Sequence, residues 1–125
     1  MKEKQLQDIT ALYGRLSRDD EVGGESMSIQ SQRAILGQYA KEYGFTNCRF
    51  FMDDGYSGTN FDRPAFTEMM ELVEQRRVRT IIVKDLSRFG RNYLEVGRYT
   101  EVIFPENKVR FIAITDGVDS AAGDN

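Results

Sequence analysis

Short apolar runs alternate along this chain with longer stretches in which apolar residues recur at helical spacing. Four runs predict strands, and they are Ile9–Leu16, Cys48–Met52, Thr80–Val83 and Val109–Ile114. The run at 80–83 consists of β-branched residues without polar alternation, which is typical of a strand buried on both faces of a parallel sheet.

The stretches between these runs predict three helices. The helices begin near Ser28, Pro64 and Tyr93 and end near Gly44, Arg77 and Phe104. Pro64 suits the first turn of a helix, and Asp62 is placed to cap it. Because strands and helices alternate, the sequence predicts an α/β fold, a three-layer α/β/α domain with a mainly parallel central sheet of about four strands.

The length and composition fit one domain. A chain of 125 residues can enclose a single sizeable core. No stretch approaches the ~20 apolar residues of a membrane span, and the polar N-terminus lacks the apolar part of a secretory signal, so a cytoplasmic location is expected. Residues 1–8 are expected to be a flexible N-terminus, 9–119 the domain, and 120–125 a flexible tail. The stretch Thr115–Asn125 reads as too small and polar to pack against a core.

The absence of histidine narrows the possible chemistry. No Ser-His or Cys-His relay can form, and the single cysteine, Cys48, has neither a disulfide partner nor metal-ligand spacing. We therefore expect Cys48 to be a small residue at a strand start. The net charge of −3 argues against a domain that coats DNA by charge alone, so positive charge should act locally.

Cationic and hydroxyl side chains gather at the predicted strand ends. Lys84, Arg88 and Arg91 follow the run at 80–83, Tyr13, Arg15 and Ser17 lie at the end of the first run, and Ser57, Asp62 and Arg63 precede the second helix. Ligands bind outside the carboxyl ends of strands in open α/β sheets, so this set predicts a pocket for a polyanion. A hydroxyl among guanidinium groups suits phosphoryl transfer to a side chain, because arginine stabilises the charge that grows on the phosphorus oxygens.

Four motifs follow one another along the chain. They are YGRLS at 13–17, SIQSQ at 28–32, YSG at 56–58 with DRP at 62–64, and DLSRFGRN at 85–92. In order and spacing they resemble the Y-x-R-x-S, S-[LI]-x-x-Q, S-G…D-R-P/K and L-D-R-L-x-R segments of the serine site-specific recombinases, the resolvase/invertase family. The resemblance covers about residues 9–119. The last motif is most similar to the large serine recombinases of conjugative and mobilisable transposons.

The resemblance implies a resolvase-like catalytic domain for DNA recombination and integration. Ser17 would attack a DNA phosphodiester to form a 5′-phosphoserine link and a free 3′-hydroxyl. The scissile phosphate would be held by Arg15, Arg63, Arg88 and Arg91. Supporting residues would be Tyr13, Gln32, Asp62, Lys84 and Ser57, with Gln32 positioning the backbone, Tyr13 buttressing the site and Asp62 orienting Arg63. No metal or other cofactor is implied, because the covalent link stores the bond energy.

The resemblance also implies partners. DNA would bind the full-length protein, and strand exchange would take place in a synaptic homotetramer built from homodimers, with no membrane involved. In the family a dimerisation helix and DNA-binding regions follow the catalytic domain, so the tail at 120–125 is expected to lead to them. An isolated catalytic domain is expected to cleave little or no DNA.

The chain departs from the family pattern at two places. Ser87 stands where the family usually has aspartate, and Asp85 is not an automatic substitute because it lies two residues earlier. The loop Arg18–Met27 is longer than in small resolvases and has no clear counterpart of the family's extra loop glutamine.

Two other functions remain open at this stage. Acidic pairs at 19–20 and 53–54, with Lys84, superficially suit a Mg²⁺-dependent phosphoacceptor domain, although the arginines would compete with the metal. A non-catalytic assembly module is the other alternative, since a slightly acidic domain attracts duplex DNA weakly.

Overall fold

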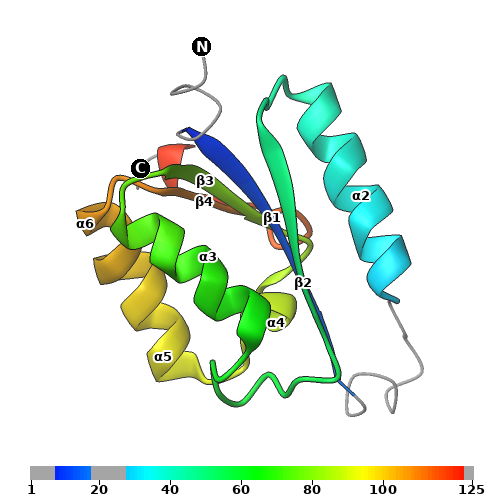
Figure 1. Cartoon of the computed structure of the whole chain (residues 1–125), viewed down its shortest axis with the longest axis vertical. Coiled ribbons are helices and arrows are strands. Elements are labelled where there is room, and N and C mark those ends of the chain that lie inside the picture. The colour runs from blue at the N-terminus through cyan, green and yellow to red at the C-terminus, as the bar shows by residue number, and fades with distance from the viewer. Residues whose placement is uncertain (1–7, 18–27, 123–125) are drawn as a thin grey trace.

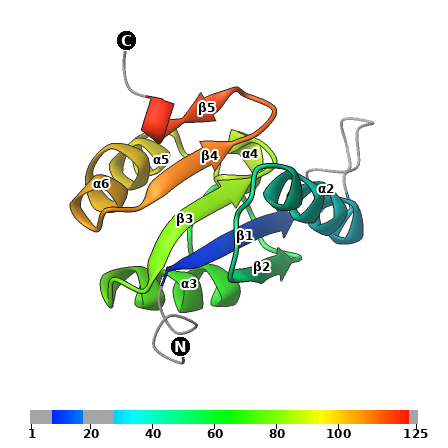
Figure 2. The ribbon, with the colours of Figure 1, turned by 90° about the horizontal axis from the view of Figure 1, so that it is seen from above.

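The computed structural model of the chain describes residues 8–17 and 28–122. Its sheet has five strands in the order β2-β1-β3-β4-β5. The strands are β1 (Ile9–Leu16), β2 (Cys48–Asp54), β3 (Val78–Val83), β4 (Arg110–Ala113) and β5 (Val118–Asp119). The first four run parallel, and β5 pairs antiparallel with β4 at the sheet edge. The predicted α/β fold is therefore confirmed, with one strand more than expected (Figures 1 and 2).

Helices cover both faces of the sheet. Helix α2 (Ile29–Glu42) lies on one face, and α3 (Pro64–Glu74) lies on the other beside a helical stretch of three segments (Figure 1). Those segments are α5 (Tyr93–Arg98), a π-helical turn at Tyr99–Ile103, and α6 (Phe104–Glu106). A short helix, α4 (Leu86–Phe89), follows β3 directly and was not predicted as a separate element.

The alternation of side chains on the central strands explains the continuous apolar runs. Leu12, Ile82 and Ile112 pack with Leu36 and Ala40 of α2 in one buried cluster. Their neighbours along β1, β3 and β4 point to the opposite face and pack with α3 and the α5–α6 stretch in a larger cluster. Both faces of these strands are buried, so polar alternation is absent, as expected for a parallel sheet enclosed by helices.

The segment after β4 differs from the prediction. Val118 packs against the larger core cluster, and Ser120–Ala122 form a 3₁₀ turn. The Ser120 hydroxyl accepts a hydrogen bond from the Phe111 backbone, and Asp119 pairs with Arg110 at 2.7 Å. The expectation that Thr115–Asn125 cannot pack against a core was wrong, because two strand residues with one apolar side chain give almost no periodic signal.

The cap of α3 was also predicted wrongly. Arg63 is the N-terminal flanking residue of α3, and the exposed Asp62 makes no side-chain cap. The first amides of the helix, those of Ala65 and Phe66, donate instead to the carboxylate of Asp53, at 2.8 and 2.9 Å. The carboxylate of Asp53, from the end of β2, thus caps α3 in place of Asp62.

The strand register determines where the predicted site lies. Tyr13 of β1 pairs with Val83, the last residue of β3, so Arg15 and Ser17 extend past the end of that strand. On the other side, Arg15 still pairs with Asp53 of β2. Helix α4 occupies the space beyond β3 and packs against β1. The carboxyl ends of β1, β2 and β3 therefore converge with α4 at one edge of the sheet.

Candidate active site

Ser17 lies between two guanidinium groups at this edge. Its Oγ is 3.4 Å from Arg15 Nη1 and 3.5 Å from Arg91 Nη2, both at the long limit of hydrogen bonding. Ser17 is 7% exposed and Arg15 is fully buried, whereas Arg91 is exposed. A phosphate placed against the hydroxyl would therefore meet one fixed cation from the sheet and one from the segment after α4.

Arg15 is held from several directions. Its guanidinium donates to the carbonyl of Tyr56 at 3.1 Å and to the carbonyl of Ser87 at 2.5 Å. Its backbone is held by the buried amide of Gln32, which accepts from Arg15 N at 3.1 Å and donates to Arg15 O at 3.0 Å. The side chain of Gln32, which belongs to α2, thus makes the pair of backbone hydrogen bonds that a neighbouring strand would make. It fixes the end of β1 that leads to Ser17.

Arg63 is fully buried and joins the same two segments. Its guanidinium donates to the Ser57 and Asn60 carbonyls at 3.2 and 3.0 Å, and to the Phe89 carbonyl at 2.5 Å. The group lies 4.4 Å from the centre of the Phe61 ring, a cation–π contact. Two backbone segments, 56–60 and 87–89, are therefore held together through the side chains of Arg15 and Arg63.

Tyr13 and Asp53 complete a buried network behind the hydroxyl. The Tyr13 phenol donates to Asp53 Oδ2 at 2.8 Å and accepts from Arg63 Nη1 at 3.1 Å. Burial, with the Asp53 charge adding to it, raises the pKa of Tyr13, so the phenol stays protonated and can donate. Asp53 is 2% exposed, and the sequence presents it only as part of an acidic pair that could suit a phosphoacceptor domain. Nothing in its spacing signalled that its carboxylate reaches Tyr13 and caps α3.

Asp85 organises α4. Its Oδ1 accepts from the Ser87 hydroxyl at 2.6 Å and from the Arg88 backbone at 3.0 Å, and Lys84 donates to its Oδ2 at 3.2 Å. Burial alone would raise the pKa of Asp85, but these three hydrogen bonds together hold it below its ordinary value. Ser87 therefore donates to a carboxylate two residues earlier, and Lys84 pairs with Asp85.

Arg88 and Ser57 lie in the two backbone segments that Arg15 and Arg63 hold together, and Asp62 follows one of them. Arg88, on α4, is 6% exposed. The Ser57 hydroxyl bonds to Thr59 within its own turn, at 2.7 Å from the threonine hydroxyl. Asp62 makes no hydrogen bond to Arg63 among the described residues, so it does not orient that guanidinium here. The loop Arg18–Met27 lies outside the described residues.

Comparison with known proteins identifies the family of the chain. The family model "Resolvase, N terminal domain" matches residues 10–124. The chain belongs to the resolvase family. The resolvase domain is similar to the N-terminal catalytic domain of TP901-1 integrase, with a TM-score of 0.81 and 27% identity over 90% of this chain and 82% of that one.

Two further proteins resemble the resolvase domain. A resolvase family site-specific recombinase from Streptococcus pneumoniae superposes with a TM-score of 0.72 and 27% identity, covering 94% of this chain and 79% of that one. "Uncharacterized immunity region protein 3" of Bacillus phage phi105 is 30% identical over 64 residues, which is 51% of this chain and 77% of that protein. The fold and the predicted family of serine recombinase catalytic domains are thus established.

The phosphoacceptor alternative finds no support in the described part of the resolvase domain. Both oxygens of Asp53 are taken by Tyr13 and by the start of α3, and the acidic pair at 19–20 lies outside the described residues. Residues 8–17 and 28–122 contain no group of three or more histidine, cysteine or acidic side chains suited to a metal ion. Within the same residues no helix is long and apolar enough to span a membrane.

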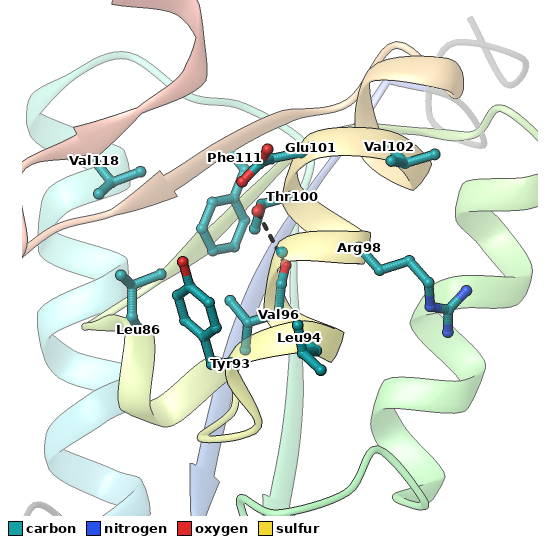
Figure 3. Close-up of a pocket in the computed structure, with 11 residues that line it drawn as sticks. Leu86, Tyr93, Leu94, Val96, Arg98, Thr100, Glu101, Val102, Phe111 and Val118 are labelled. Carbon is teal, nitrogen blue, oxygen red and sulfur yellow. Dashed lines mark hydrogen bonds between the residues drawn. The ribbon is translucent and has the colours of Figure 1, made fainter.

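A groove of about 570 Å³ lies beside α5, and Ser17 is not among the residues that line it (Figure 3). Its walls are mainly apolar and include Leu86, Tyr93, Phe111 and Val118. Tyr93 and the neighbouring Leu94 are among the most exposed large apolar side chains of the described residues. Leu86 belongs to α4, so the groove and the Ser17 site share that short helix.

Proposed function

We propose that the resolvase domain cleaves and rejoins DNA strands with Ser17 as the nucleophile. The observation that carries this proposal is the placement of the Ser17 hydroxyl between Arg15 of β1 and Arg91 of the segment after α4. Cations beside a hydroxyl favour its ionised form, and they stabilise the negative charge that develops on a phosphate under attack.

The reaction forms one bond and breaks another. Ser17 Oγ attacks phosphorus, the P–O3′ bond breaks, and the released 3′-oxygen takes up a proton as the serine loses one. The products are a 5′-phosphoserine link and a free 3′-hydroxyl. Reversal by a 3′-hydroxyl of another strand reseals the backbone, so the step needs no external energy source.

The arginines have different proposed roles in this reaction. Arg15 and Arg91 contact the reacting oxygen directly, and Arg88 of α4 is proposed to bind the phosphate beside them. Arg63 was predicted as a phosphate contact, but its full burial and its carbonyl partners favour a positioning role. It holds together the two backbone segments that also receive Arg15. Gln32 and Tyr13 position β1, and Lys84 and Ser57 act within their own turns.

The wider role follows from the family. Recombinase domains act on DNA in assemblies, and we propose that this domain acts in a homodimer and in a synaptic homotetramer of the full-length protein. Excision or integration of a mobile element is the proposed outcome, by similarity to an integrase domain and to a site-specific recombinase. The activity of the 125-residue chain alone is expected to be low.

Trapping on nicked DNA tests the proposal. The full-length protein would be incubated with a pool of nicked duplexes of varied sequence, in which the broken strand cannot be religated. Wild-type protein should accumulate a covalent protein–DNA adduct, and Ser17→Ala should bind the pool without forming one. The matched control is Ser31→Ala, which removes an exposed hydroxyl on α2 and should behave as wild type. An adduct formed by Ser17→Ala would refute the proposal.

A further inference from the structure

We propose that Gly58 sets the positions of Arg15 and Arg91 around Ser17 by leaving no room for a side chain. The inference rests on the proposed function of Ser17 and assigns a positioning residue to that site. The evidence for it is how closely neighbouring atoms approach the position that a Cβ atom of residue 58 would occupy. Gly58 is buried, although the residues that follow it in the same turn are exposed.

The two guanidiniums pack against the bare Cα of Gly58. A Cβ atom added there would lie 2.7 Å from Arg15 Nη2 and 2.8 Å from Arg91 Nε, closer than real Cβ contacts come. It would also lie 2.9 Å from Arg15 Cζ. These are the two side chains whose other nitrogens approach the Ser17 hydroxyl. A methyl group at this point would therefore push both cations at once.

The backbone carbonyls of the same turn accept hydrogen bonds from the arginines. The Tyr56 carbonyl accepts from Arg15, the Ser57 carbonyl accepts from Arg63, and the Gly58 carbonyl accepts from the Arg91 backbone at 2.6 Å. Three successive carbonyls thus receive three different arginines. Hydrogen bonds hold Arg15 and Arg91 at the turn, and contact with Gly58 determines how closely their guanidinium groups approach its backbone.

A side chain at Gly58 should impair catalysis more than folding. Gly58 does not have the positive φ that disfavours L-residues, unlike Gly55 at +94°. The atoms that a Cβ would meet belong to the guanidinium ends of two long side chains and not to the backbone, so the clash falls on these groups before it reaches the fold. Gly90 is the opposite case, because a Cβ there would lie 2.5 Å from the rigid ring of the partly buried Phe61. We therefore expect Gly58→Ala to fold and Gly90→Ala to be strongly destabilised.

The first test is structural and needs no DNA. The Nε–Hε signals of Arg15, Arg63 and Arg91 would be compared by NMR in the wild-type chain, in Gly58→Ala and in the control Gly37→Ala. A Cβ at Gly37 meets only Phe50, at an ordinary 3.8 Å. Gly58→Ala should shift the Arg15 and Arg91 signals and leave Arg63 nearly unchanged, with a thermal midpoint close to wild type. Unchanged signals, or an unfolded Gly58→Ala, would overturn the inference.

The second test measures chemistry in the full-length protein. Under single-turnover conditions on the nicked duplexes, Gly58→Ala should form the adduct about 100-fold more slowly, the scale expected for displacement of catalytic groups by an ångström. Its DNA affinity should stay within about threefold of wild type, and Gly37→Ala should match wild type in both. An unchanged rate in Gly58→Ala overturns the inference alone, whereas an adduct formed by Ser17→Ala overturns the proposed function beneath it.

Discussion

The guanidinium of Arg91 lies 3.5 Å from the hydroxyl of Ser17, although 74 residues separate them in the chain. Helix α4 makes this contact possible, because it turns the chain back toward β1 immediately after β3 ends. The backbone of Arg91 is then fixed to the Gly58 carbonyl. The Ser17 hydroxyl and the Arg91 guanidinium are therefore brought together by the ends of β1 and β3, by α4 and by the turn that contains Gly58.

Arg91 and Arg63 are predicted to respond in opposite ways to truncation. Arg91→Ala should slow adduct formation by ~10³-fold or more, by analogy with arginines that stabilise phosphoryl-transfer transition states, and should leave the unfolding free energy within about 1 kcal/mol of wild type because Arg91 is exposed. Arg63→Ala should lose about 3 kcal/mol of stability, since it leaves the buried Phe89 carbonyl and the partly buried Asn60 carbonyl without this donor. Urea unfolding and single-turnover trapping measure the two effects. Equal losses of stability would contradict this division of roles.

Asp53 is predicted to be a main support of the site. Asp53→Ala removes the acceptor of the Tyr13 phenol and of two amides of α3, and should cost about 3 kcal/mol in unfolding free energy. The matched control is Asp54→Ala at the exposed neighbouring position, which should change stability by less than about 0.5 kcal/mol. Similar unfolding midpoints for the two variants would show that the buried network contributes little.

Gln32 is predicted to stabilise β1 through the backbone of Arg15. Gln32→Ala removes the two hydrogen bonds between its amide and the Arg15 backbone and should cost about 2 kcal/mol in unfolding free energy. Gln38→Ala, on the exposed side of the same helix, is the control and should cost less than about 0.5 kcal/mol. If both variants unfold at the same urea concentration, the amide clamp is not a significant contact.

The pair of Asp119 and Arg110 is predicted to make the sheet edge sensitive to acid. The hydrogen bond from Arg110 holds the pKa of Asp119 below its ordinary value of 3.8. A lowered folded-state pKa means that the stabilisation is complete above the ordinary value and is lost as the pH falls through the folded-state value. Wild type should therefore be more stable than Asp119→Asn at pH 6, and the difference should shrink as the pH falls below the ordinary value of 3.8. A difference that is constant from pH 6 to pH 2.5 would contradict this prediction.

The sequence predicted the central elements well because local signals and burial agree there. The bounds of β1 are those expected, and α2 begins after Ser28 and ends before Gly44, whose φ is +76°. The apolar runs of β3 and β4 and the proline at the start of α3 carried similar information. In each case the residues that define the element are close together in the chain.

The parts that were missed depend on contacts between distant residues. Asp53 replaces Asp62 as the cap of α3 because β2 continues two residues further than its apolar run and delivers the carboxylate. Arg63 belongs to the predicted set, but only the fold shows that backbone carbonyls from two segments enclose it. Buried polar side chains that bond to distant backbone carbonyls do not recur at a regular spacing, so no sequence pattern predicts them.

Mapping the covalent link tests the central claim most directly. The adduct formed on a nicked duplex would be digested with protease and nuclease, and the nucleotide-bearing peptide would be sequenced by mass spectrometry. We predict that the peptide contains Ser17, that the added group is a phosphate ester of the DNA 5′ end, and that the released fragment ends in a 3′-hydroxyl. A link to any other residue, or to a 3′-phosphate, would contradict the account.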